Sequence, residues 1–181
     1  MSSEELQELH EHAEKGRHNK SLARVSLSMA VLAVLVAVVA LLGHRAHTEE
    51  VVLQTKSTDQ WAFYQAKNIR RHNDDLFSDL MSVIGTKDPA AAEKLRDKYQ
   101  EEATRYQSEQ KEVEEEARKL ESEVITERRR ADRYDLAEVF LEIGLVITSI
   151  TLLSGKRIFW QSGIVLGIVG IVVAASGAII H

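Results

Sequence analysis

Three long apolar runs limit what this chain can fold into more than any other feature of its sequence. They cover residues 25–42, 136–153 and 158–180. An α-helix needs about 20 apolar residues to cross the hydrocarbon core of a bilayer. Charged residues make up 28% of the chain and lie mostly outside these runs, so the remainder is too polar to bury three such helices in a soluble core. The sequence therefore predicts three transmembrane helices.

The first run is predicted to be a permanent anchor rather than a cleaved signal peptide. A secretory signal begins with a short, positively charged segment, whereas the residues that precede Val25 include five glutamates. The predicted segments are a polar N-terminal tail able to form a helix (1–24), transmembrane helix 1 (25–43), an extramembrane region (44–135), transmembrane helix 2 (136–153) and transmembrane helix 3 (158–180).

The extramembrane region is predicted to be a helical hairpin whose tip lies near residues 85–89. Gly85 suits the end of one helix, and Asp88 and Pro89 suit the N-cap and first position of the next. The two arms are nearly equal in length. Equal arms are expected if the first two membrane spans are continuous with them and both arms return to the same surface.

Hydrophobic spacing predicts that the two arms pair as an antiparallel coiled coil, because residues suited to a seam alternate at intervals of three and four. In the second arm the rows are Tyr99, Tyr106, Val113 and Leu120, and Ala103, Gln110, Ala117, Val124 and Ala131. In the first arm they are Ala62, Ile69, Leu76 and Val83, and Ala66, Asn73 and Leu80.

The first arm carries more apolar residues than one seam can bury. The surplus residues are Trp61, Phe63, Tyr64, Phe77, Met81 and Ile84. We expect them to contact another copy of the chain or a protein partner. The alternative is partial exposure of scattered aromatic residues, which is common in proteins.

Small residues recur along one face of two predicted membrane helices. They are Gly163, Gly167, Gly170, Ala174 and Gly177 in the third helix, and Ala30, Ala33 and Ala37 in the first. Small side chains let helix backbones approach closely in a membrane. We expect these faces to pack helices together, either within one chain or between copies.

Two glutamates near the start of the second span form a candidate intramembrane polar site. Glu138 and Glu142 lie one helical turn apart and could line a cation path or relay a proton. His44 and Arg45 end the first span on the same side of the membrane. We favour a structural pairing of these cations with the two carboxylates near the membrane surface.

No catalytic, cofactor-binding or metal-binding residue is predicted. The sequence contains no phosphate loop, nucleophile elbow or zinc-protease motif. His10, Glu14 and His18 share a helical face, but three ligands without a fourth favour a solvated helix. With a net charge of −5, the chain has no basic excess to favour nucleic acid as a partner.

Basic residues predict the orientation in the membrane. The tail contains Lys15, Arg17, Lys20 and Arg24, and the loop between the last two spans contains Lys156 and Arg157. Short basic segments favour the cytoplasm, so we expect a cytoplasmic N-terminus and a periplasmic hairpin. The arginines at 128–130 and 133 oppose this orientation, but they belong to a long segment and weigh less.

The stretch DQWAFYQAKNIR, residues 59–70, resembles the signature of a bacterial membrane-protein family catalogued as domain of unknown function 4337. The resemblance covers most of the chain, from the anchor helix to the two closing membrane helices. It implies a bacterial membrane setting without an established activity. It also marks Trp61, Tyr64, Gln65 and Lys67 as contact residues of the family.

Together these features predict an all-α protein of the bacterial inner membrane. The function they favour is non-enzymatic: a homo-oligomeric structural, scaffolding or partner-docking protein, with the lipid bilayer around its spans and a protein partner on the hairpin. The alternative is an oligomeric ion channel or transport-accessory protein whose second span lines a polar path. No cofactor is expected in either case.

Overall fold

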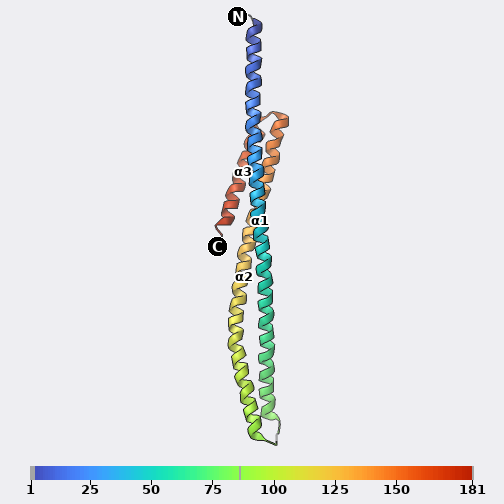
Figure 1. The fold of residues 1–181 in the computed structure, drawn as a ribbon, viewed down its shortest axis with the longest axis vertical. Coiled ribbons are helices and arrows are strands. Elements are labelled where there is room, and N and C mark those ends of the chain that lie inside the picture. Colours follow the sequence, from blue (N-terminus) through green and yellow to red (C-terminus); the bar gives the residue numbers. More distant parts are fainter. Residues whose placement is uncertain (1–2, 86, 181) are drawn as a thin grey trace. The chain divides into compact units, whose positions relative to one another are not determined.

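The chain folds into three α-helices, shown in Figure 1: α1 (Ser3–Val83), α2 (Pro89–Ser154) and α3 (Arg157–Ala178). This computed structural model describes the backbone of residues 3–85 and 87–180, and the side chains from Leu22 onward. The three histidine and glutamate side chains of the tail therefore lie outside the described residues. Within the described part of the chain there is no strand, which confirms the all-α prediction. Each helix contains a segment long and apolar enough to cross a membrane.

The helices contribute to two compact units. The three-helix unit comprises Met1–His47 and Thr126–His181, and the hairpin unit comprises Thr48–Ile125. Both α1 and α2 supply residues to each unit.

The core of the three-helix unit contains few large side chains. Its buried cluster draws Leu32, Val39 and Ala46 from α1, and Ala131, Tyr134, Ala137 and Leu141 from α2. Helix α3 adds the buried glycines Gly163, Gly167, Gly170 and Gly177. Close backbone approach, which favours dispersion contacts between membrane helices, is thus built into this unit.

At several positions of α3 the neighbouring atoms leave no room for a side chain larger than that of glycine. A Cβ atom at Gly163 would lie 2.0 Å from Oγ1 of Thr148 and 2.6 Å from the backbone oxygen of Gly144. One at Gly170 would lie 3.0 Å from the backbone oxygen of Ala137. The small-residue face of α3 therefore packs within the chain, mainly against α2.

The three alanines of the first span lie elsewhere. Ala30, Ala33 and Ala37 are exposed, whereas α1 buries Val25, Leu32 and Val39 at intervals of seven residues. A packing role for the alanines would have to involve lipid or another copy, and it stays a prediction.

The turn between α2 and α3 depends on Gly155. Its φ of +65° lies in the left-handed region that favours glycine, and its backbone N–H donates to the oxygen of Thr151 at 2.9 Å. This geometry ends α2 and lets α3 begin two residues later.

The hairpin unit turns between Val83 and Pro89, at the segment that the sequence singles out as its strongest helix break. The carboxylate of Asp88 accepts a hydrogen bond from the backbone N–H of Ala91 at 3.1 Å, as an N-cap does. In α2, Ala103, Gln110, Val113, Ala117 and Val124 are buried in the seam, as their spacing predicts.

The predicted seam of the first arm was wrong. Its residues face away from α2: Ile69 is 62%, Leu76 53% and Val83 77% exposed. The residues that α1 buries against α2 are instead Leu53, Ser57 and Ser78, with Gln60, Tyr64, Lys67, Arg71 and Asp74 half-buried. Polar partners on α2 explain this choice, because they satisfy hydrogen-bonding groups that would otherwise be desolvated without compensation.

Candidate functional site

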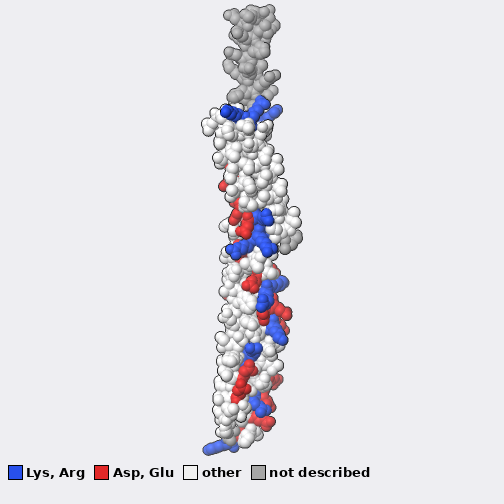
Figure 2. Space-filling view, turned by 180° about the vertical axis from the view of Figure 1, so that it is seen from behind, with Lys and Arg blue, Asp and Glu red and all other residues white. Residues whose placement is uncertain are grey.

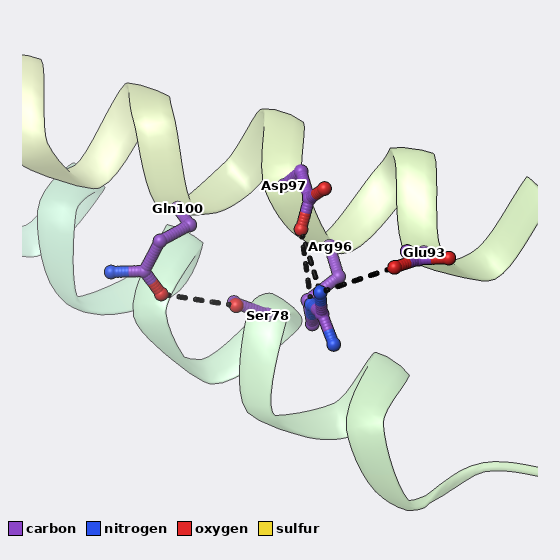
Figure 3. Close-up of polar contacts among 5 residues, drawn as sticks. All are labelled: Ser78, Glu93, Arg96, Asp97 and Gln100. Carbon is purple, nitrogen blue, oxygen red and sulfur yellow. Dashed lines mark hydrogen bonds and ion pairs between the residues drawn. The ribbon is translucent and has the colours of Figure 1, made fainter.

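The hairpin is closed by polar contacts that cross from α1 to α2. Gln60 Nε2 donates to Glu116 Oε2 at 2.7 Å, and Lys67 Nζ forms an ion pair with Glu109. Nearer the tip, Ser78 Oγ donates to Gln100 Oε1 at 3.3 Å, as Figure 3 shows. Later residues of α1 pair with earlier residues of α2, so the arms are antiparallel. We call this row of contacts the polar seam.

Lys67 is the centre of the polar seam. Its side chain is only 14% exposed. The ammonium lies 4.8 Å from the ring centroid of Phe63 and 5.7 Å from that of Tyr106, besides its ion pair with Glu109. Two aromatic faces and a carboxylate around one cation compensate its partial desolvation.

The charge of Glu109 is stabilised by its neighbours. The hydrogen bond from Lys67 lowers the pKa of the Glu109 carboxyl below its ordinary value, and the positive charges of Lys67 and Arg105 add to this effect against desolvation. Arg105 Nε lies 3.6 Å from Glu109 Oε1. Asp74 shows the opposite behaviour, because burial and the nearby carboxylates of Glu102 and Asp75 raise its pKa.

The family-motif residues divide between the polar seam and the surface. Trp61 and Tyr64 form an edge-to-face pair with centroids 5.5 Å apart, and the guanidinium of Arg118 lies 5.7 Å from the Trp61 ring. Lys67 lies in the polar seam, whereas Gln65 is exposed. Trp61 and Lys67 thus contact α2, whereas the ring partner of Tyr64 lies on α1 itself.

Close to the tip, the charged residues of α2 pair along the helix. Arg96 donates through Nε and Nη2 to Oδ1 of Asp97, at 3.1 and 2.8 Å, and approaches Glu93 at 3.9 Å. Figure 3 shows this cluster on α2 beside the Ser78–Gln100 contact. These ion pairs are solvent-exposed and contribute little to stability.

Of the four residues of the predicted intramembrane polar site, Glu138 is half-buried, and Glu142, His44 and Arg45 are exposed. Their pairing stays a prediction.

One α1–α2 contact of the three-helix unit in this region joins His47 Nε2 to Asp135 Oδ2 at 3.0 Å. The sequence analysis did not identify Asp135. Its position could have drawn attention to it. Asp135 lies where the charged arm meets the second apolar run, and His47 lies near the end of the first run.

The hydroxyl groups of α2 face the interior of the three-helix unit. Thr148 is fully buried, and its Oγ1 donates to the backbone oxygen of Gly144 at 2.7 Å. Thr151 is 4% exposed, and its Oγ1 has no hydrogen-bond partner within the described part of the chain. Glu142 is exposed, so it does not share this buried face with the two threonines.

A tryptophan ties α3 to α1 near the basic end of the three-helix unit. Trp160 Nε1 donates to Ser28 Oγ at 2.8 Å, and that hydroxyl donates to the backbone oxygen of Val25 at 2.9 Å. An apolar groove of about 330 Å³ lies between the two helices, and it is lined by Leu27, Val31, Leu35, Ile164, Ile168 and Ile171. Figure 2 shows a largely uncharged surface on this unit, with basic side chains at one end. Such a surface suits contact with lipid.

Among the described residues, no group of three or more histidine, aspartate or glutamate side chains is placed to hold a metal ion. No curated protein and no solved structure matches the chain. The family model described as domain of unknown function (DUF4337) matches residues 21–180, from the end of the tail through the motif around Trp61 to the last helix. The chain therefore belongs to the DUF4337 family.

Proposed function

We propose that this protein is a non-enzymatic, homo-oligomeric scaffold of a bacterial inner membrane, in which three transmembrane helices anchor a helical hairpin that docks protein. The three apolar helices support the anchoring. In the three-helix unit, glycine packing and a buried core support a structural role, because they leave α1, α2 and α3 tightly joined.

One observation carries the docking role. The first arm of the hairpin exposes Phe63, Ile69, Leu76, Phe77, Leu80 and Val83 on α1, and Ile84 directly after its end. Solvated proteins seldom leave a contiguous apolar surface of this kind uncovered, and such surfaces usually mark protein contacts. Phe77 also stacks on Tyr99 of α2 and Phe63 faces Lys67, but both rings remain about half exposed, and the other five residues lie outside the polar seam.

Counting subunits in the membrane tests the oligomer. One fluorophore is attached to each copy of the full-length protein at low density, and bleaching steps are counted in single spots. We expect more than one step in most spots. A single step throughout would overturn the homo-oligomeric part of the proposal.

The alternative function is an oligomeric channel, and the observation that favours it is Glu142, an exposed carboxylate within an apolar segment. Burial of Thr148 and Thr151 against other helices weakens it, since they do not extend a polar path from Glu142. Conductance across bilayers that contain the purified protein decides between the two. We expect no current; a current that Glu142→Ala abolishes and Glu49→Ala preserves would establish the channel instead.

A further inference from the structure

The exposed apolar face of α1 forms a regular row along the first arm of the hairpin. Its members lie at alternating intervals of four and three residues: Ala62, Ala66, Ile69, Asn73, Leu76, Leu80 and Val83. None of them is charged, and all of them are exposed. In the view of Figure 2, charged side chains gather on one side of the hairpin and leave the other side largely uncharged. We call these seven residues the outer row.

The spacing of the outer row is that of a coiled-coil seam. Alternating steps of four and three give a period of 3.5, and that period keeps one stripe facing a partner helix along its whole length. The row begins after Asp59, a charged residue at the preceding seam position, and ends at the hairpin turn. The polar seam, on another side of α1, already holds α2, so α2 of the same chain does not cover the outer row.

We propose that the outer row docks against the outer row of a second copy of this chain, as a parallel coiled coil in which Asn73 pairs with Asn73 of the second copy. This deepens the proposed function, on which it rests, by naming the partner of the exposed face. A helix with this period is complementary to itself, because each apolar side chain inserts between those of an identical helix.

Membrane insertion fixes the direction of the pair. The first arm begins at Thr48, beside the first apolar segment, and ends at the tip. In two copies inserted the same way, both first arms therefore begin at the same membrane surface, because each follows its first span directly in the chain. Two copies in one membrane can bring their outer rows together side by side only as parallel helices.

Asn73 sets the register. It is the single polar member of the outer row, and a lone asparagine inside a parallel seam specifies alignment because the two amides hydrogen-bond only when they lie at the same level. A shift by one heptad would place Asn73 against Ala66 or Leu80 of the second copy. The amide would then be buried without a partner, which is unfavourable.

The positions beside the outer row allow this register. In a parallel pair, Gln65 faces Arg70 of the second copy, His72 faces Phe77, and Asp79 faces Ile84. No like charges meet at these positions; Phe77 also stacks on Tyr99 of its own chain, and Ile84 follows the end of α1. The in-register pair is therefore free of the repulsion that would separate it.

Confinement to a membrane compensates for the modest length of the contact. Residues 62–83 extend about 33 Å as a helix, which is short for a coiled coil in free solution. Two copies anchored in one membrane meet in a plane. This raises their effective concentration without any new contact.

Cysteine cross-linking of the full-length protein in its membrane tests the proposal, since the chain contains no cysteine of its own. Ile69→Cys places a thiol in the outer row, and Asn68→Cys places one on the neighbouring exposed position outside it. We expect oxidation to give a covalent dimer with Ile69→Cys and to lose it with Asn68→Cys. Equal cross-linking at both positions, or none at Ile69→Cys, would overturn the proposal.

Mixed cross-linking tests the register. Ile69→Cys and Leu76→Cys are expressed together with different tags, and each should cross-link only to itself. Positions one heptad apart are separated by about 10 Å along the helix, too far for a disulfide. A mixed dimer as abundant as the two matched ones would overturn the register. Oligomers by subunit counting without a cross-link at Ile69→Cys would reject only the outer row, whereas monomers would reject the homo-oligomer as well.

Discussion

At the scale of single residues, the smallest side chains and one buried cation determine most of what the helices can do. Glycines on α3 bring it within backbone contact of α2, and Lys67 concentrates aromatic and acidic partners in the hairpin. The sequence predicted the glycine face because small residues recur at helical spacing. It did not predict the position of Lys67 in the seam, because a lysine inside an apolar-looking pattern gives no sign of which neighbour will neutralise it.

Replacing Gly163 by alanine should destabilise the three-helix unit. The added methyl group would meet the Thr148 hydroxyl and the backbone of Gly144 at distances that require the helices to move apart. We expect a loss of about 1–3 kcal/mol in unfolding free energy. Thermal unfolding in detergent measures it, with Gly85→Ala as the control, because a Cβ at Gly85 has nothing within 4 Å. Equal melting temperatures for the two variants would contradict the packing role.

The Lys67–Glu109 pair should make hairpin stability depend on pH. Folding lowers the pKa of Glu109, so the pair stabilises the fold above the ordinary value of 4.5, and this stability is lost as pH falls through the lowered folded pKa. Glu109→Gln should therefore weaken hydrogen-exchange protection of hairpin amides at neutral pH, with the difference from wild type disappearing on acidification.

The exposed residue Glu115 supplies the control for this comparison, as Glu115→Gln should change protection little at any pH. Asp74 has a raised pKa and affects stability in the opposite sense, but it is present in both proteins and cancels in the difference. A pH-independent difference between Glu109→Gln and wild type would show that the pair does not titrate with folding.

At the scale of elements, α2 followed its pattern and α1 did not. The rows of α2 that the spacing predicts to lie in the seam are the residues that the structure buries or half-buries there. Helix α1 carries two candidate faces: an apolar one, now exposed, and a polar one that complements α2. Periodicity shows which residues share one face of a helix, but not which helix that face contacts. Because the prediction looked for apolar faces, it chose the apolar face of α1 over the polar one. Hydrogen-bond complementarity between the arms decided the pairing, and it is visible only once the arms are aligned.

The turn at the hairpin tip should depend on its cap. The Asp88 carboxylate accepts the Ala91 N–H, which would otherwise be one of the unsatisfied donors at the start of α2. Asp88→Ala should cost about 1 kcal/mol. Faster amide exchange in the first turn of α2 would report this loss. The neighbouring exposed residue provides the comparison, because Lys87→Ala leaves the cap intact and should not change exchange there.

At the scale of the whole molecule, the apolar runs predicted three helices able to cross a membrane and the family match extends over nearly the whole chain. The candidate polar site was less predictable. The pairing of His44 and Arg45 with the two glutamates stays a prediction. The contact between His47 and Asp135 was not predicted, because it depends on the direction in which each side chain leaves its helix.

Labelling from one side of the membrane should reveal the proposed orientation. Lys87→Cys places a thiol at the hairpin tip, and Ser154→Cys places one at the turn between α2 and α3. With the N-terminus cytoplasmic, a membrane-impermeant maleimide added to intact spheroplasts should react at the tip and spare the turn. Lysis should expose both. Reaction at the turn alone before lysis would reverse the orientation.

The three-helix unit is discontinuous in the chain, and this has a consequence for synthesis. The 78 residues from Thr48 to Ile125 lie between its two parts. At about 5–20 residues per second, the ribosome needs roughly 4–16 s to make them. In the proposed topology, the first apolar segment would wait in the lipid during that interval without its partners from α2 and α3, and Leu32 and Val39 would tolerate this because they are apolar. We therefore expect the three-helix unit to assemble last, after the hairpin has left the ribosome.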